Sequence, residues 1–264
     1  MNAIKRSLFA LAISIGAIAG AQAAPLTITA GTLLGVDANS RQLIEYTFGG
    51  SINESLGLSG TFSTLVGVEV LGSSVYVMGV GGDIGLVDLN TGAVTFLFNG
   101  GGNEGLGGRG GNLLISNFSG TVNEYTVGGS LVGSFVVAAG GTGIDGVGTG
   151  FMVANYSDAN VRTYDAAGAM IGSFSTGLSA NEISGSAFDS GAGTYWISTG
   201  FGRDDIRNYT STGVLLSSFG AQASWINGLD VISSGERPVP EPASLALFGL
   251  ACAALATSRR RKAK

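Results

Sequence analysis

Residues 145–174, DGVGTGFMVANYSDANVRTYDAAGAMIGSF, contain two segments whose pattern recurs along the chain. The first, DGVGTGFMVAN, is a glycine-rich turn that leads into an apolar strand. The second, VRTYDAAGAMIGSF, has the pattern of two strands joined by a tight turn. Copies of the first segment occur at residues 64–79, 104–117 and 184–199, and copies of the second at 42–48, 84–98, 122–135 and 206–219.

Two kinds of residue mark the repeat. Tyr125, Tyr164 and Tyr209 are each followed ten residues later by a phenylalanine: Phe135, Phe174 and Phe219. Glycines that we align in the first segment are Gly67, Gly105, Gly146, Gly185 and Gly228, at intervals of 38 to 43 residues. A period of about 40 residues with about four short strands per repeat is typical of a β-propeller blade.

The pattern predicts an all-β fold with five blades. Apolar residues alternate in short runs, as at Val75 and Val77, and no long amphipathic helical segment accompanies the repeat. The repeat begins with a second segment at 33–48 and ends with a first segment at 225–235, so the two end fragments together complete one blade. The pattern resembles NHL-type and SMP-30-like propellers. A β-sandwich or an open β-solenoid is the alternative.

The N-terminus has the three parts of a secretory signal peptide. Lys5 and Arg6 precede an apolar stretch at 8–19, and Ala21-Gln22-Ala23 is an A-x-A cleavage site. We therefore expect residues 1–23 to be removed on export. An uncleaved anchor helix is the alternative, although the apolar stretch is short for a membrane span.

The C-terminus combines a short motif, an apolar run and a basic end. The motif is Val239, Pro240, Glu241 and Pro242; the basic residues are Arg259, Arg260, Arg261 and Lys262. As a helix, the 16 residues 243–258 would reach about 24 Å, a short but possible transmembrane span. The basic cluster would stay on the cytoplasmic side of the membrane.

These three parts, in this order over residues 238–264, resemble the PEP-CTERM sorting domain of Gram-negative bacteria. The same segment is also labelled an ice-binding protein C-terminal domain, a label that describes the tail and not an activity. The resemblance implies export by the secretion machinery and transient insertion in the inner membrane. An exosortase-type membrane protease would then release the protein to the cell surface or the extracellular space. An ordinary C-terminal anchor is the alternative.

The exported domain expected at 24–237 is acidic. Between residues 25 and 240 there are six arginines, no lysine and 17 acidic residues, a net charge of −11. A domain of this charge repels the phosphates of nucleic acids, so we do not expect it to bind DNA or RNA. Solubility after export explains the charge, and cation binding is the alternative explanation.

The residue types restrict the chemistry available to the chain. It contains no histidine, and its one cysteine, Cys252, lies in the apolar tail, so histidine-dependent triads and metal sites are excluded. The residues before the aligned glycines include Glu104, Asp145 and Asn227, which a propeller would gather around its central channel. Oxygen ligands of this kind suit Ca²⁺. The alternative is that these residues cap turns by hydrogen bonds to the backbone.

We expect a binding or structural component of the cell surface or matrix, associated with exopolysaccharide or biofilm. Tyr156, Phe201, Trp196 and Trp225 are candidate platforms for sugar rings, although Trp196 fits a core position better. The alternative function is a calcium-dependent hydrolase or lactonase that uses the channel. The sequence leaves open whether the chain has any catalytic activity.

Overall fold

The computed structural model describes residues 25–62, 64–200 and 203–233. Within these ranges the secondary structure consists of 20 β-strands. No helix in the same ranges is long and apolar enough to cross a membrane. The predicted signal peptide at 1–23, the sorting tail at 238–264 and its expected helix at 243–258 lie outside the described residues.

The strands form five antiparallel sheets of four strands each, which we number as blades I to V. Blade I contains β20 (Ile226–Ile232), β1 (Thr32–Asp37), β2 (Gln42–Thr47) and β3 (Ile52–Gly57). Blade II contains β4 (Leu65–Leu71), β5 (Ser74–Gly79), β6 (Asp83–Val87) and β7 (Val94–Asn99). Blade III contains β8 (Gly105–Arg109), β9 (Asn112–Asn117), β10 (Thr121–Tyr125) and β11 (Leu131–Val136). Blade IV contains β12 (Gly141–Val147), β13 (Gly150–Asn155), β14 (Asn160–Tyr164) and β15 (Met170–Ser175). Blade V contains β16 (Ile183–Asp189), β17 (Thr194–Thr199), β18 (Asp205–Tyr209) and β19 (Leu215–Gly220).

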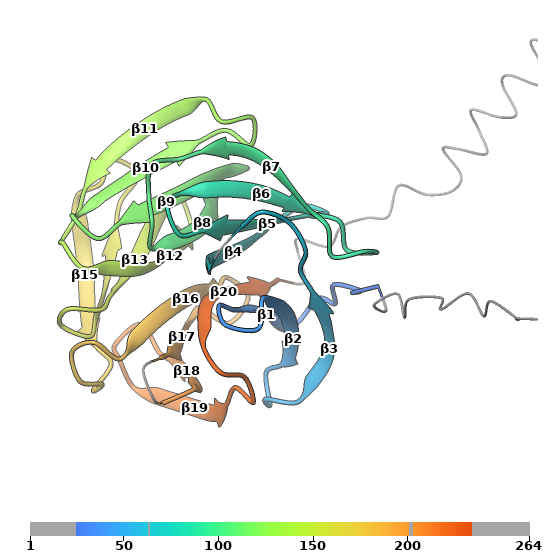
Figure 1. Cartoon of the computed structure of the whole chain (residues 1–264). Helices are drawn as coiled ribbons and strands as arrows, with labels where there is room; N and C mark the ends of the chain where they lie inside the picture. The colour runs from blue at the N-terminus through green and yellow to red at the C-terminus, as the bar shows by residue number, and fades with distance from the viewer. Residues whose placement is uncertain (1–24, 63, 201–202, 234–264) are drawn as a thin grey trace, which may run out of the picture.

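The blades are arranged around a central axis as a five-bladed β-propeller (Figure 1). The first strand of each blade lies at the axis: β20, β4, β8, β12 and β16. The last strand of each blade lies at the periphery: β3, β7, β11, β15 and β19. The prediction of an all-β propeller is therefore confirmed, and the β-sandwich and the β-solenoid are excluded.

Blade I joins the two ends of the described chain. Strand β20 pairs antiparallel with β1, with Leu34 opposite Asp230 and Thr32 opposite Ile232. The predicted composite blade is thus confirmed. Because no covalent bond closes the ring, this pairing of the first and last strands stabilises the circular arrangement.

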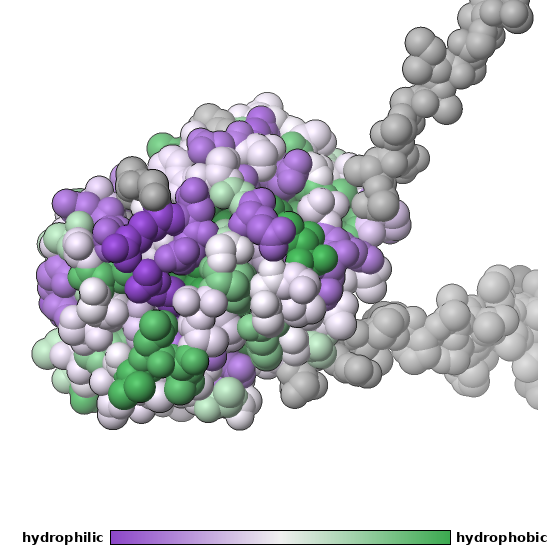
Figure 2. Space-filling view, turned by 90° about the horizontal axis from the view of Figure 1, so that it is seen from below, coloured by the Kyte–Doolittle hydropathy of each residue, from purple (hydrophilic) through white to green (hydrophobic). Residues whose placement is uncertain are grey.

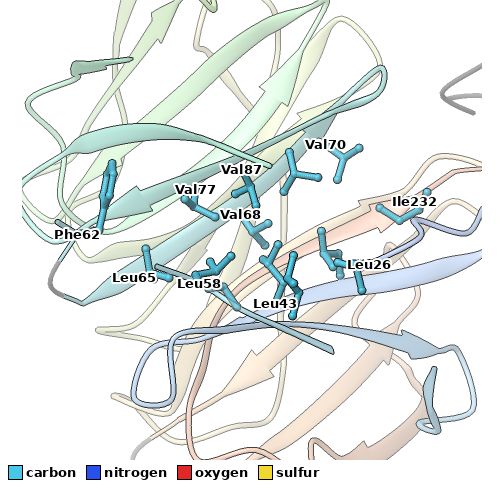
Figure 3. Packing of buried hydrophobic residues seen from close by; sticks show 14 residues of the cluster. Leu26, Leu43, Leu58, Phe62, Leu65, Val68, Val70, Val77, Val87 and Ile232 are labelled. Carbon is cyan, nitrogen blue, oxygen red and sulfur yellow. The ribbon is translucent and has the colours of Figure 1, made fainter. Parts of the chain in front are cut away.

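The hydrophobic core is divided into five clusters, and each cluster lies between two neighbouring blades. Between blades I and II, Leu43 and Leu65 pack with Val68 and Val77 in a layer made by both sheets (Figure 3). Strands near the axis have neighbours on both faces, and all six residues of β13 are buried. This explains why the inner strands are apolar runs, whereas strands with one solvent face show strict alternation.

The repeated aromatic pair connects blades. Phe174 of blade IV packs against Tyr209 of blade V, with ring centroids 6.1 Å apart. Phe219 of blade V packs in the same way against Tyr46 of blade I, at 5.9 Å. The tyrosine and the phenylalanine of one repeat therefore contact different neighbours, and each pair stabilises one interface between blades.

A glycine in each outer hairpin lies over the ring of the preceding blade. Gly168 adopts a left-handed backbone with φ of 84°, and a Cβ atom there would lie 2.9 Å from the ring of Phe135. Both the turn and the close contact therefore favour glycine. The equivalent glycines are Gly50, Gly92, Gly129, Gly168 and Gly213.

The outermost strands expose apolar side chains to solvent. Ile171 of β15 and Leu131 of β11 are 68% and 59% exposed. Figure 2 shows a group of apolar residues beside polar ones on the surface seen from below. The outer edge of the propeller thus differs from the axis, where the inner strands are buried.

Candidate functional site

A ring of glycines allows the inner strands to approach one another at the axis. A Cβ atom on Gly67 would lie 2.5 Å from the Cβ of Leu106, and one on Gly143 would lie 2.6 Å from the backbone nitrogen of Ser186. A side chain at these positions would force neighbouring backbones apart. The five ring glycines are Gly67, Gly105, Gly143, Gly185 and Gly228. The space between them leaves no room for a water molecule, so the channel is closed in its middle.

The prediction placed Gly146, and not Gly143, in this ring, and that alignment is wrong. Strand β12 shifts its pairing register between Gly141 and Gly143, as β4 does between Leu65 and Gly67. Gly143 and Gly146 are only three residues apart, and the sequence pattern does not distinguish them. Consequently Thr142, not Asp145, precedes the ring glycine of blade IV.

The closed ring separates two cavities, of which the first lies where the inner strands begin. This mouth pocket has a volume of about 200 Å³. The residue before every ring glycine lines it: Val66, Glu104, Thr142, Ser184 and Asn227. Three aromatic side chains complete the wall: Phe118, Tyr156 and Trp225. Phe118 and Tyr156 meet edge to face, with centroids 5.9 Å apart.

The polar groups of the mouth pocket differ in how they are satisfied. The Ser184 hydroxyl donates to the carbonyl of Ile226 at 2.7 Å, and the Thr142 hydroxyl donates to the carbonyl of Ile183 at 3.4 Å. For Glu104, burial raises the pKa of the carboxyl above its ordinary value, and no bonding partner lowers it again. The pocket therefore contains a half-buried carboxylate without a partner among the described residues.

The second cavity, the acidic pocket, lies where the inner strands end, and its volume is about 210 Å³. Glu69, Asp145 and Asp230 occupy the same position in three blades, two residues after the ring glycine. All three are buried, and their carboxylate oxygens lie within 4.8 Å of one another. Three like charges at this distance repel one another unless other groups compensate.

Contacts with the next blade explain these acids structurally. Asp230 accepts a hydrogen bond from the backbone N–H of Val70 at 2.7 Å, and Asp145 accepts one from Phe188 at 2.7 Å. Asp145 also accepts from the N–H of Gly146 at 2.6 Å. Each of these two carboxylates therefore satisfies a backbone donor of the neighbouring inner strand, which would otherwise lack a partner near the axis.

Arg109 also lines the acidic pocket, but its charge is directed elsewhere. Its guanidinium forms an ion pair with Glu124 and lies 4.9 Å from the ring centroid of Phe135 and 5.5 Å from that of Phe151. Arg109 is thus held by a carboxylate and two aromatic rings between blades III and IV.

The three predicted calcium ligands do not line one cavity. Glu104 and Asn227 lie in the mouth pocket, whereas Asp145 lies in the acidic pocket beyond the glycine ring. Calcium binding by these residues stays a prediction. Its test is calorimetry of the exported protein, because an ion bound only to the folded state raises the melting temperature and EDTA reverses the rise.

Sequence reasoning missed Glu69 and Asp230, the two residues that accompany Asp145 in the acidic pocket. A signal was present, since an acid follows the ring glycine after one residue in V-G-V-E, T-G-I-D and N-G-L-D. The misplaced glycine of blade IV concealed this pattern, because it moved Asp145 to a different position of the repeat.

The predicted aromatic platforms are distributed differently. Trp196 is buried in the core, as expected, and stacks on Phe48 with centroids 5.3 Å apart. Tyr156 and Trp225 line the mouth pocket together with Phe118, which the sequence reasoning did not select. Phe201 lies outside the described residues.

Comparison with protein families assigns the C-terminus. Residues 238–262 match the family described as the PEP-CTERM protein-sorting motif. The match includes the motif Val239–Pro242 and the basic run Arg259–Lys262, all of which lie outside the described residues. The motif implies an exported protein of a Gram-negative bacterium that is anchored transiently in the membrane and processed by an exosortase.

Comparison with solved structures supports the fold. One chain of a nidogen–laminin complex is similar with a TM-score of 0.53 and 10% identity, over 76% of this chain and 99% of that one. A protein of unknown function from Bacteroides caccae has a TM-score of 0.47 and 13% identity, over 73% and 74% of the two chains. Virginiamycin B lyase from Staphylococcus aureus has a TM-score of 0.46 and 14% identity, over 72% and 69%. No curated protein matches the sequence significantly.

Fold and tail together define a class of protein: a five-bladed β-propeller followed by a PEP-CTERM sorting motif. At these identities, structural likeness shows the fold and not the activity. The narrower resemblance to SMP-30-like propellers and the ice-binding label are not confirmed.

Proposed function

We propose that the chain is a non-enzymatic binding component of the cell surface or extracellular matrix, and that it holds a matrix polysaccharide in the mouth pocket. The sorting motif supports export and release from the membrane. The observation that carries the binding proposal is the mouth pocket itself, where residues of all five blades meet beside three aromatic rings. Aromatic faces next to hydrogen-bonding groups suit sugar rings, which have apolar faces and polar edges.

The position of the pocket relative to the tail supports this role. Ser233, which follows the last strand β20, lines the acidic pocket at the other end of the channel. The sorting motif begins at residue 238, only a few residues further along the chain. While the tail is in the membrane, the mouth pocket would therefore open away from it and remain accessible to an external polymer.

Binding is tested with the exported protein and the exopolysaccharide of the producing strain. We expect the wild-type protein to be retained on the immobilised polymer and Trp225→Ala to be eluted early, because the variant loses one wall of the pocket. Trp225→Phe, which keeps an aromatic wall, is the matched control and should retain binding. If the wild-type protein is retained on no matrix polymer, the binding proposal is wrong.

Processing at the tail is tested separately. Replacing Pro240 and Glu241 with alanine leaves the apolar length and the basic end intact. A sorting signal would then fail, and the protein would remain in the inner membrane, whereas a simple anchor would behave as before. Fractionation shows the location, and mass spectrometry shows the C-terminus. Recovery of released wild-type protein that still ends in Lys264 would contradict proteolytic processing.

A further inference from the structure

Glu104 is placed where its charge needs a partner that the protein does not supply. Its backbone precedes the ring glycine Gly105, which holds the side chain in the mouth pocket. The carboxyl is half-buried, and among the described residues no hydrogen bond or ion pair reaches it. By contrast, Glu124 pairs with Arg109 and Glu182 pairs with Arg203. A desolvated carboxylate without a partner is unfavourable unless a ligand compensates it.

The rest of the pocket also favours a ligand that donates hydrogen bonds. The hydroxyl hydrogens of Ser184 and Thr142 are used by backbone carbonyls, so their oxygens face a ligand as acceptors. The faces of aromatic rings carry partial negative charge, and three rings line this pocket. No lysine or arginine is among the lining residues. The electrostatic character of the pocket is therefore negative.

The volume limits what enters. At about 200 Å³ the mouth pocket is smaller than the usual sites for drug-sized ligands, which begin at about 300 Å³. It accommodates a single small group or sugar unit and not a length of polymer. An anionic unit such as a uronate would be repelled by Glu104, and a neutral unit would leave the carboxylate uncompensated.

We propose that the mouth pocket binds an ammonium group, with Glu104 as its counter-ion and Phe118, Tyr156 and Trp225 as the surrounding aromatic wall. An ammonium donates charge-assisted hydrogen bonds to the carboxylate and is attracted by the ring faces. This inference rests on the proposed function, and it narrows the matrix unit to a hexosamine whose amine is free. A small organic amine would offer the same chemistry.

The test uses the exported protein and four probes in calorimetry: glucosamine, N-acetylglucosamine, glucose and choline. Acetylation removes the charge while keeping the sugar ring, so glucosamine should bind at least tenfold more tightly than N-acetylglucosamine. Glu104→Gln should reduce glucosamine affinity at least tenfold and leave N-acetylglucosamine affinity unchanged. Glu54→Gln, on the outer strand β3, is the matched control and should bind as wild type. Equal melting temperatures of wild type and Glu104→Gln would show that the variant folds.

The pH dependence provides a second readout. Binding requires the ionised form of Glu104, whose pKa is raised by burial, so affinity for glucosamine should fall as the pH drops through that pKa. Choline keeps its charge at every pH, and its binding should show the same acid limb. Glu104→Gln should abolish this limb for both probes.

The outcomes separate the two proposals. Equal affinity for glucosamine and N-acetylglucosamine, with loss of both in Trp225→Ala, overturns the ammonium inference and keeps the sugar site. Binding of choline without any saccharide keeps the ammonium inference and overturns the polysaccharide proposal. Failure to bind all four probes overturns the ammonium inference, and the retention experiment on the native polymer then decides the polysaccharide proposal alone.

Discussion

The two ends of the channel use acidic residues in opposite ways. At the acidic pocket, Asp145 and Asp230 accept backbone hydrogen bonds from neighbouring blades. At the mouth pocket, Glu104 has no such partner, although it is half-buried. The comparison indicates that an acid near a propeller axis is not by itself a binding site. Its bonding partners distinguish an acid that holds blades together from one that is available to a ligand.

The first way to break this comparison is to open the ring that separates the two pockets. In Gly143→Val, the new side chain would meet the backbone of Ser186 at 2.6 Å, and the inner strands cannot separate without disturbing both pockets. We expect a loss of at least about 3 kcal/mol in unfolding free energy, the upper part of the range for overpacking. Chemical denaturation measures it. Gly220→Ala, where a Cβ atom would meet nothing within 4 Å, is the control and should change stability little.

The next largest effect is expected at the acidic pocket. Asp145→Ala leaves the N–H groups of Phe188 and Gly146 without their acceptor, which costs about 2 kcal/mol after relief of repulsion from Glu69 and Asp230. Asp145→Asn keeps one acceptor and removes the charge, so its loss should be about half as large. Thermal unfolding compares the two variants. An alanine variant as stable as wild type would contradict the structural role of this acid.

At the mouth pocket the corresponding change should not destabilise the protein. The folded-state pKa of Glu104 is raised, so the folded protein binds its proton more tightly than the unfolded chain does. Wild-type stability should therefore fall as the pH rises from the ordinary glutamate pKa of about 4.3 through the raised value. Glu104→Gln lacks this loss and should gain relative stability across the same window. Denaturation at several pH values measures the difference, and a constant difference would contradict an unpaired Glu104.

The smallest effect is expected at the rim of the mouth pocket. Val80 lines the pocket but is 52% exposed. Val80→Ser should change the unfolding free energy by no more than about 0.5 kcal/mol, as exposed substitutions generally do. A larger loss in the same denaturation assay would show that the rim supports the fold and is not only a lining for a ligand.

Much of the fold could be predicted because the repeat appears in residues that the blades require locally. The Tyr164–Phe174 pattern reflects two rings that each contact a neighbouring blade, and this contact recurs around the circle. The site could be predicted only in part. Glu104 and Asn227 were found because they precede glycines that are unambiguous, whereas Asp145 was misaligned beside two glycines three residues apart.

The sequence by itself determined the export signals, the acidic domain, the repeat and the closure of the ring by its two ends, since all of these depend on residue types at regular spacing. Only the tertiary structure decided which acids meet. Residues in five separate repeats come together at the axis, and a register shift of one strand determines at which end of the channel a side chain lies. Whether a carboxylate then has a partner depends on the backbone of the next blade, which no local pattern specifies.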